Sequence, residues 1–278
     1  MPVLDAKLKA RSSLMPLLVL ALFAGGCSGN QAKLDADPVS TSSITNAPTM
    51  DATRLKAEAD APSYVRTRQL ADLWAAHPGD EKIGMEYATN LGKLGQADTQ
   101  ADVLKSLSVA HPDDVDLQAR IGKEFLAAQR PGEAAAILER ATNSGKADWK
   151  TYSALGTAYD QQGQFDLARQ QYNKALAMQP GALGVQNNLG MSYALQGKLP
   201  EAEKILSTAL AQPNSAIMPQ IRQNLALVVG LQGRTEEARK IASADLPPDQ
   251  VEANMQYLQQ MLSKPNPWAQ LSSQNAAN

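Results

Sequence analysis

The feature that most constrains the fold of this chain is a pattern that returns every 34 residues. At this interval the sequence has a small residue, and an aromatic or aliphatic residue follows three positions later. The small residues are Ala88, Gly122, Gly156 and Gly190, with Ala226 following after 36 residues. The larger residues are Leu91, Phe125, Tyr159, Tyr193 and Val229. A fixed period of this length indicates stacked copies of one structural unit, because each copy buries its apolar face only against its neighbours.

Each unit is predicted to be a hairpin of two helices. Glycines recur in the middle of most units, where a helix has to end and left-handed backbone angles are needed. These glycines are Gly95, Gly163, Gly197 and Gly233. Alanines recur in the second half of the units, and a proline such as Pro180 stops the second helix. We expect five units, which start at Glu81, Val115, Trp149, Leu183 and about Pro219.

A further helix is expected on each side of the five units. Residues 63–76 carry apolar residues at helical spacing and are interpreted as the second half of a degenerate unit. The segment "LPPDQVEANMQYLQQML" starts with proline and aspartate, as a capping helix would, and its apolar residues share one face. Those residues are Val251, Met255, Leu258 and Met261. The folded part is therefore predicted over residues 55–262, followed by a disordered tail over residues 263–278.

One unit matches a known repeat most clearly, "WKTYSALGTAYDQQGQFDLARQQYNKALAMQP". Its signature positions resemble those of the tetratricopeptide repeat family. They are Tyr152, Leu155, Gly156, Tyr159, Ala168, Tyr172, Ala175 and Pro180. The resemblance implies an all-α fold, a superhelical solenoid of helical hairpins whose concave groove is lined by the first helices. It also implies that the groove binds a protein or peptide segment.

The geometry of the same family implies which side chains face the groove. They are Glu86, Arg120, Lys123, Ser153, Thr157, Asn187, Asn188, Gln223 and Asn224. An amide side chain can accept a hydrogen bond from the N–H of a bound backbone and donate one to its C=O. Asn188 and Asn224 hold the same place in successive units. Replacing these two asparagines with alanine is expected to weaken partner capture and to leave helical melting almost unchanged. The alternative is that "NNL" and "QNL" only echo the family consensus.

The N-terminal residues are typical of a secretory signal. Three basic residues precede an apolar run over residues 14–23, which is too short to span a bilayer of roughly 30 Å. The sequence "AGGC" that follows resembles a bacterial lipobox, in which the thiol of Cys27 would receive a diacylglycerol group. We therefore expect a lipoprotein signal peptide over residues 1–26 and lipidation at Cys27. The alternative is an ordinary cleaved signal with a chance cysteine.

A polar linker is predicted between this anchor and the repeats. Residues 27–54 are rich in Ser, Thr, Asn, Asp, Ala and Pro and cannot bury enough apolar surface to fold. Ser28 follows the cysteine, where an aspartate would favour retention in the inner membrane of many bacteria. The expected location is therefore the periplasmic face of the outer membrane.

The sequence contains no motif for catalysis or metal binding such as HExxH, CxxC or a P-loop. His77 and His111 both precede proline at matching places in neighbouring units, and they are predicted to be helix-end residues. The formal net charge is −2, without the basic clustering that nucleic acid requires. We therefore predict no enzyme activity, no cofactor, no metal site and no nucleic-acid partner.

The whole layout resembles the TadD family of lipoproteins, which belong to tight-adherence (Flp) pilus assembly. The resemblance rests on the lipobox, the polar linker, five or six repeats and the "LPPDQVEAN" helix. It implies a non-enzymatic scaffold with a pilotin-like role, with the pilus secretin as a candidate partner and a membrane contact through Cys27. The alternatives are type IV pilus pilotins, the lipoprotein of outer-membrane β-barrel assembly, and an adaptor that regulates a peptidoglycan hydrolase.

Overall fold

The computed structural model describes residues 63–263, and this part of the chain is all helical. Its α-helices are α2 (Tyr64–Ala76), α3 (Glu81–Lys93), α4 (Ala97–Ala110), α5 (Val115–Ala127), α6 (Pro131–Asn143), α7 (Trp149–Gln161), α8 (Phe165–Met178), α9 (Leu183–Leu195), α10 (Leu199–Leu210), α11 (Pro219–Leu231), α12 (Thr235–Ala242) and α13 (Pro248–Leu262), with a 3-10 helix, η1 (Ser215–Ile217). The predicted signal peptide, Cys27, the linker and residues 264–278 of the predicted tail lie outside the described residues.

The five expected units are confirmed as five helical hairpins. Their first helices are α3, α5, α7, α9 and α11, and each begins at the residue that the 34-residue period indicated. The two flanking helices are also confirmed, as α2 and α13. All four apolar residues of the capping helix, from Val251 to Met261, are buried. No helix within residues 63–263 is both long enough and apolar enough to cross a bilayer.

Aspartates fix the start of three of the first helices. The carboxylate of Asp80 accepts a hydrogen bond from the backbone N–H of Ile83 at 2.9 Å, and Asp114 and Asp148 do the same at the starts of α5 and α7. A side chain of this kind satisfies a backbone donor that the helix itself leaves unpaired. The two histidines follow directly after α2 and α4, which confirms that they are helix-end residues.

The turn within each hairpin needs a left-handed residue. The four predicted glycines have φ between +72° and +85°, as expected. In the second unit this place belongs to Gln129, which has φ +57° and is the one non-glycine residue with positive φ in the described part of the chain. The backbone geometry of the turn is therefore kept even where the sequence lacks its glycine, at the cost of left-handed strain.

The two helices of a hairpin approach closely at the small residue of the first helix. A Cβ atom added at Gly156 would lie only 2.6 Å from a ring carbon of Tyr172, and one added at Gly122 would lie 2.5 Å from Cγ of Leu138. Real Cβ atoms do not come this close to another atom. The small residue therefore lets a large side chain of the second helix lie against the backbone of the first.

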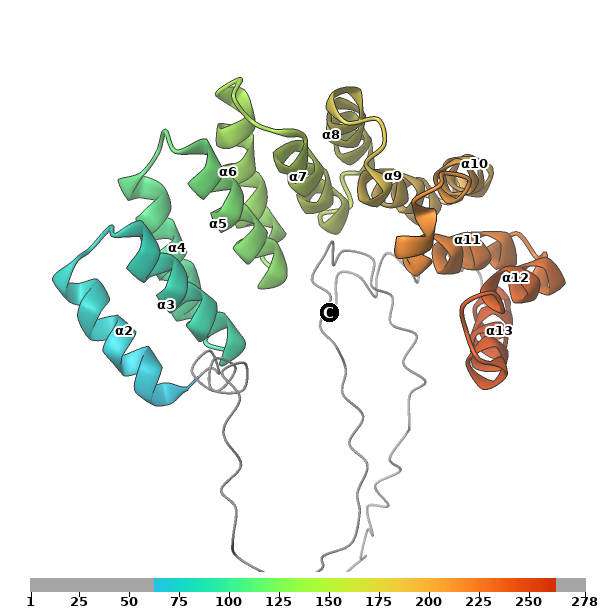
Figure 1. Ribbon diagram of the computed structural model, residues 1–278, viewed down its shortest axis with the longest axis horizontal. Coiled ribbons are helices and arrows are strands. Elements are labelled where there is room, and N and C mark those ends of the chain that lie inside the picture. The colour runs from blue at the N-terminus through green and yellow to red at the C-terminus, as the bar shows by residue number, and fades with distance from the viewer. Residues whose placement is uncertain (1–62, 264–278) are drawn as a thin grey trace, which may run out of the picture.

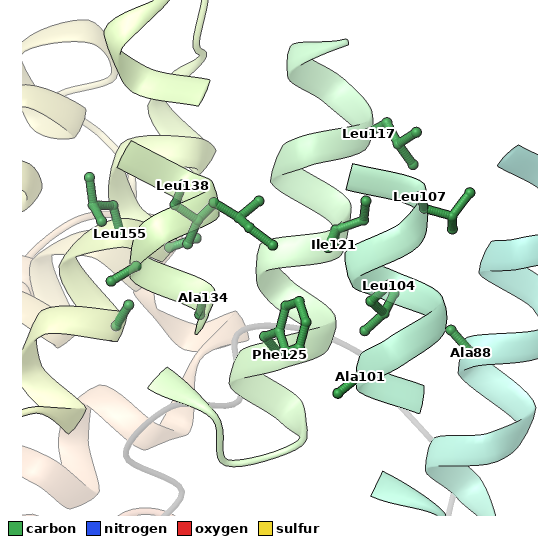
Figure 2. Close-up of a cluster of buried hydrophobic side chains, with 14 of the residues drawn as sticks. Ala88, Ala101, Leu104, Leu107, Leu117, Ile121, Phe125, Ala134, Leu138 and Leu155 are labelled. Atoms are coloured by element: carbon green, nitrogen blue, oxygen red, sulfur yellow. The ribbon is translucent and has the colours of Figure 1, made fainter. Parts of the chain in front are cut away.

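The core runs along the whole solenoid between the two layers of helices. Figure 2 shows part of it, with Leu104, Ile121, Phe125 and Leu138 pointing into the space between successive helices. The buried apolar residues form two clusters, one extending from α2 to α9 and the other from α9 to α13. Tyr193 packs against both of them, so α9 is the element at which the core divides.

The close approach at Gly156 predicts a specific stability effect. Replacing Gly156 with valine should lower the free energy of unfolding by about 2 kcal/mol or more, because the new side chain overlaps the ring of Tyr172. Gly132 in α6 is the matched control, since nothing lies within 4 Å of an added Cβ there, and Gly132→Val should change stability by less than about 0.5 kcal/mol. Urea unfolding followed by helical circular dichroism measures both variants, and equal stability of the two would contradict the packing described.

Candidate functional site

The first helices of the hairpins form the inner face of an arch. Figure 1 shows the chain curving from α2 to α13, with α5, α7, α9 and α11 on the inner side and α6, α8 and α10 on the outer side. Successive first helices also contact one another, from α3 through α11, whereas successive second helices make no comparable contact in the described residues. The first helices therefore form the inner layer of the arch, in which neighbouring repeats are closest together.

The N-terminal half of the inner face is charged. Arg120 of α5 forms an ion pair with Glu81 of α3, and Lys123 is exposed one turn further along α5. Glu86, a predicted inward residue of α3, pairs with Arg66 of α2. These pairs are partly exposed to solvent, so each contributes little to stability, but they hold the charged side chains in fixed positions.

A carboxyl group lies beside these cations in a less accessible place. Burial raises the pKa of Glu124 on α5, and the positive charges of Arg120 and Lys93 partly oppose that shift. Glu124 also accepts a hydrogen bond of 3.4 Å from the side-chain amide of Gln100 on α4. Among the predicted residues on this half of the face, Lys123 is exposed and has no ion-pair partner in the described residues, whereas Arg120 and Glu86 are paired.

The C-terminal half of the inner face carries amides. The side-chain N–H of Asn224 on α11 donates to Oδ1 of Asn187 on α9 at 2.8 Å. The side-chain N–H of Asn187 in turn donates to Oδ1 of Asn188 at 3.5 Å. Asn187 is only 5% exposed, while Asn188 and Asn224 are half-buried. Three amides from two successive repeats therefore form one chain, with its two ends accessible from the inner face.

Thr157 and Gln223, two further predicted residues, form hydrogen bonds with other groups of the protein. Thr157 is buried; its hydroxyl donates to the backbone oxygen of Ser153 at 3.2 Å and lies 3.3 Å from the hydroxyl oxygen of Tyr172. Gln223 is half-buried and donates to Asp245, in the segment after α12, at 3.4 Å.

The exposure of the predicted residues corrects the set that family geometry suggested. Thr157 and Asn187 are buried and bonded to other groups of the chain, so their side chains support the inner face without being available to a partner. Arg120, Lys123, Asn188, Gln223 and Asn224 keep at least part of their surface. The inward direction of these five side chains stays a prediction, since exposure alone does not show which face they line.

Two charged residues that pair with predicted residues were not among the predicted set. Glu81 and Arg66 each hold one of the predicted charged side chains in an ion pair. Neither lies at a position that the repeat pattern marks as inward, and only the charge complementarity between adjacent units could have indicated them. Within residues 63–263, no group of three or more His, Cys, Asp or Glu side chains could hold a metal ion.

Comparisons with known proteins agree with this geometry. The model of the family described as "Tetratricopeptide repeat" matches residues 153–217. A crystal structure of PilW, described as a widely conserved type IV pilus biogenesis factor, superposes with a TM-score of 0.56 and 20% identity over 73% of this chain and 96% of that one. The MamA protein superposes with a TM-score of 0.50 and 19% identity, over 64% of this chain and 94% of that one.

A curated relative extends the similarity in sequence. The uncharacterized protein y4yS of Sinorhizobium fredii (strain NBRC 101917 / NGR234) is 30% identical over 101 residues, which are 36% of this chain. The match spans 56% of that relative, so the chain covers about half the length of the curated protein it matches. The fold and the matched residues together define a tetratricopeptide-repeat solenoid.

The amide chain changes what is expected of the two exposed asparagines. Asn224→Ala should lower the free energy of unfolding by about 1–3 kcal/mol, because it leaves the buried oxygen of Asn187 without its donor. Asn188→Ala should change it by less than about 0.5 kcal/mol, since the only hydrogen bond it loses is the long one. From the sequence we had expected the two replacements together to leave helical melting almost unchanged.

Urea unfolding of the two single variants tests this difference. If Asn224→Ala is as stable as the wild type, the hydrogen bond between α11 and α9 contributes nothing and the amide chain is not a structural unit. Asn188→Ala serves as the internal control, because it removes an amide from the same face but breaks only the long hydrogen bond of 3.5 Å from Nδ2 of Asn187, whereas Asn224→Ala breaks one of 2.8 Å.

Proposed function

We propose that this protein is a lipid-anchored scaffold for assembly of a tight-adherence (Flp) type IV pilus system, with a role like that of the TadD lipoproteins. Its anchor is Cys27 at the periplasmic face of the outer membrane, and its inner face holds a segment of a pilus component such as the secretin. The observation that carries the binding part of this proposal is the amide chain shared by α9 and α11.

The chemistry of that amide chain suits an extended protein segment. A bound backbone offers N–H and C=O groups in alternation, and an asparagine can accept from the first and donate to the second. Asn224 uses its N–H on Asn187, which leaves its oxygen for a partner's N–H, and the N–H groups of Asn188 are free of partners in the described residues. Lys123, which is exposed on the other half of the face, favours an acidic side chain in the same segment, whereas Arg120 is already paired with Glu81.

The anchor part of the proposal rests on the N-terminal sequence. The composition of the roughly 25 polar residues after Cys27, which lie outside the described residues, predicts a tether with a reach of roughly 25–30 Å. Each buried CH₂ of an acyl chain adds about 0.8 kcal/mol, so two or three chains hold a protein to the membrane for its lifetime. The inner face would therefore remain near the membrane while the solenoid is free to turn toward a partner.

The assignment to a pilus rests on the layout of the sequence. The lipobox, the linker, the repeats and the end helix resemble the TadD lipoproteins in the same order. PilW has a similar fold and is described as a pilus biogenesis factor, but at 20% identity that likeness concerns the fold. A lipoprotein of β-barrel assembly and an adaptor of a peptidoglycan hydrolase have the same general build and are the rival functions.

The anchor and the pathway are tested together in the native bacterium. Cys27→Ser should move the protein from the membrane fraction to the soluble periplasm, because no thiol remains to carry lipid, and surface pili should be lost. Electron microscopy counts the pili, and fractionation follows the protein. Ser28→Ala is the matched control and should keep both the membrane location and the pili, whereas Ser28→Asp should move the protein to the inner membrane.

Other outcomes decide between the rival functions. Intact pili with an altered cell-wall composition after deletion would identify the hydrolase adaptor. Reduced outer-membrane β-barrel proteins would identify the barrel assembly role. Membrane retention of the Cys27→Ser variant would contradict the lipid anchor whichever pathway is affected.

A further inference from the structure

A buried carboxylate joins the third repeat to the fourth. Asp160, near the end of α7, is only 3% exposed. The hydroxyl of Tyr172 on α8 donates to its Oδ2 at 2.9 Å, and the hydroxyl of Ser192 on α9 donates to its Oδ1 at 2.7 Å. One acidic side chain thus binds both the second helix of its own repeat and the first helix of the next repeat.

The repeat architecture does not require an acid at this position. Asp160 is the twelfth residue of its unit, and the other four units have small or apolar residues there. Those residues are Gly92, Leu126, Ala194 and Gly230. At Gly230 the missing side chain makes room for Leu258 of the capping helix, since an added Cβ would lie 2.5 Å from a methyl group of that leucine. The twelfth position therefore contacts the following element in more than one unit, and only the third unit fills it with a titratable group.

This cluster lies where the hydrophobic core divides. One apolar cluster ends on α9 with Val185 and Leu189, and the other begins on the same helix with Leu183 and Met191. Between the third and fourth repeats, the polar cluster is added to apolar packing, since the first apolar cluster continues from α7 and α8 to Val185 and Leu189 of α9. A change in the charge of Asp160 acts on this joint directly, because the carboxylate is bonded to α9 through Ser192.

The other charged groups around Asp160 do not neutralise it by direct pairing. Arg169 of α8 is 7% exposed, its guanidinium lies 4.7 Å from the ring centroid of Tyr193, and its ion-pair partner is Asp166. The Nη1 atom of Arg169 has no hydrogen-bond partner. Its positive charge therefore favours the ionised form of Asp160 only through space.

Charged side chains on α5 and α6, which also pack on α7, are bonded to groups other than Asp160. On α6, Glu139 accepts a hydrogen bond of 2.6 Å from the hydroxyl of Tyr159, and burial together with this carboxylate raises the pKa of that tyrosine to about 12. On α5, Arg120 pairs with Glu81 and Glu124 bonds to Gln100, so both point toward the preceding repeat. Asp160 is thus the titratable group at the centre of this joint.

Burial raises the pKa of Asp160 to about 7, although the hydrogen bonds from Ser192 and Tyr172 and the charge of Arg169 lower it. The hydroxyls of Tyr172 and Ser192 can form hydrogen bonds with either the ionised or the protonated form of Asp160. The carboxylate accepts from both, whereas the protonated carboxyl group can donate to one hydroxyl and still accept from the other. The joint can therefore hold a proton or release it without losing the whole network.

We propose that Asp160 makes the joint between the third and fourth repeats sensitive to protons, so that the joint is tight when the acid is protonated and looser when it is ionised. Repeats of a solenoid contact only their neighbours, so a looser joint changes how α9 to α13 sit relative to α2 to α8. This inference concerns the fold and holds whether or not the pilus function is correct.

The direction of the effect follows from linkage. The pKa of Asp160 in the folded joint is above the value of about 4 that an exposed aspartate has, so the stabilisation is complete below pH 4 and is lost as the pH rises through 7. Between these limits, the equilibrium constant for opening the joint should increase by up to about tenfold per pH unit, and it should level off above pH 7.

Hydrogen exchange of the intact protein measures this opening. Amides of α8 and α9 are followed by mass spectrometry between pH 5 and 8, with rates corrected for the intrinsic pH dependence of exchange. In the wild type their opening should rise from pH 5 to 7, and in Asp160→Asn it should be independent of pH because the amide does not ionise. Asp72→Asn, at an exposed site on α2, is the matched control and should behave like the wild type.

Two results would overturn the inference. One is a wild type whose opening does not change over this range after correction, and the other is an Asp160→Asn variant that keeps the wild-type pH dependence. A titration of the wild type by carbon NMR at the carboxyl carbon of Asp160 is independent of the folding of any variant. A midpoint near 7 supports the proton-sensitive joint, and a midpoint near 4 contradicts it.

Discussion

In the second, third and fourth repeats the two helices meet where a glycine of the first helix accepts a large side chain of the second. Leu138 against Gly122 and Tyr172 against Gly156 are the tightest of these contacts within hairpins. The contact sets the distance between the two layers of helices, and with the short turns it makes each hairpin a rigid unit. This one contact is repeated from α5 to α10, along the middle of the arch.

Much of the fold was predictable because this contact leaves a periodic trace in the sequence. The small residue, the aliphatic residue three places later and the turn glycine fixed the starts of the first helices correctly. Gln129 shows the limit of that pattern, since its left-handed backbone is imposed by the hairpin without the residue type that would announce it. The burial of Thr157 and Asn187 was not predictable either, because it depends on how much of each side chain the surrounding helices cover.

The inner face combines two chemistries in different repeats. Charged side chains of α3 and α5 are ordered by ion pairs, while α9 and α11 share a chain of amides. Asp160 lies between these two regions, in the joint through which α9 is attached to the third repeat. Alignment of the five units could have indicated this acid, because the other four units have a small or apolar residue at the twelfth position. A single joint thus connects a charged part of the face to a polar, uncharged part.

The claim at the centre of this account is that the inner face holds a protein partner. Photo-crosslinking in the native bacterium tests it most directly, with a photoreactive residue in place of Asn188 on the inner face or of Asn173, an exposed residue of the outer helix α8. The account predicts that the reactive residue at position 188 captures one defined protein, identified by mass spectrometry as a pilus component, and that position 173 does not. Equal capture of the same proteins from both positions, or none from position 188, would contradict it.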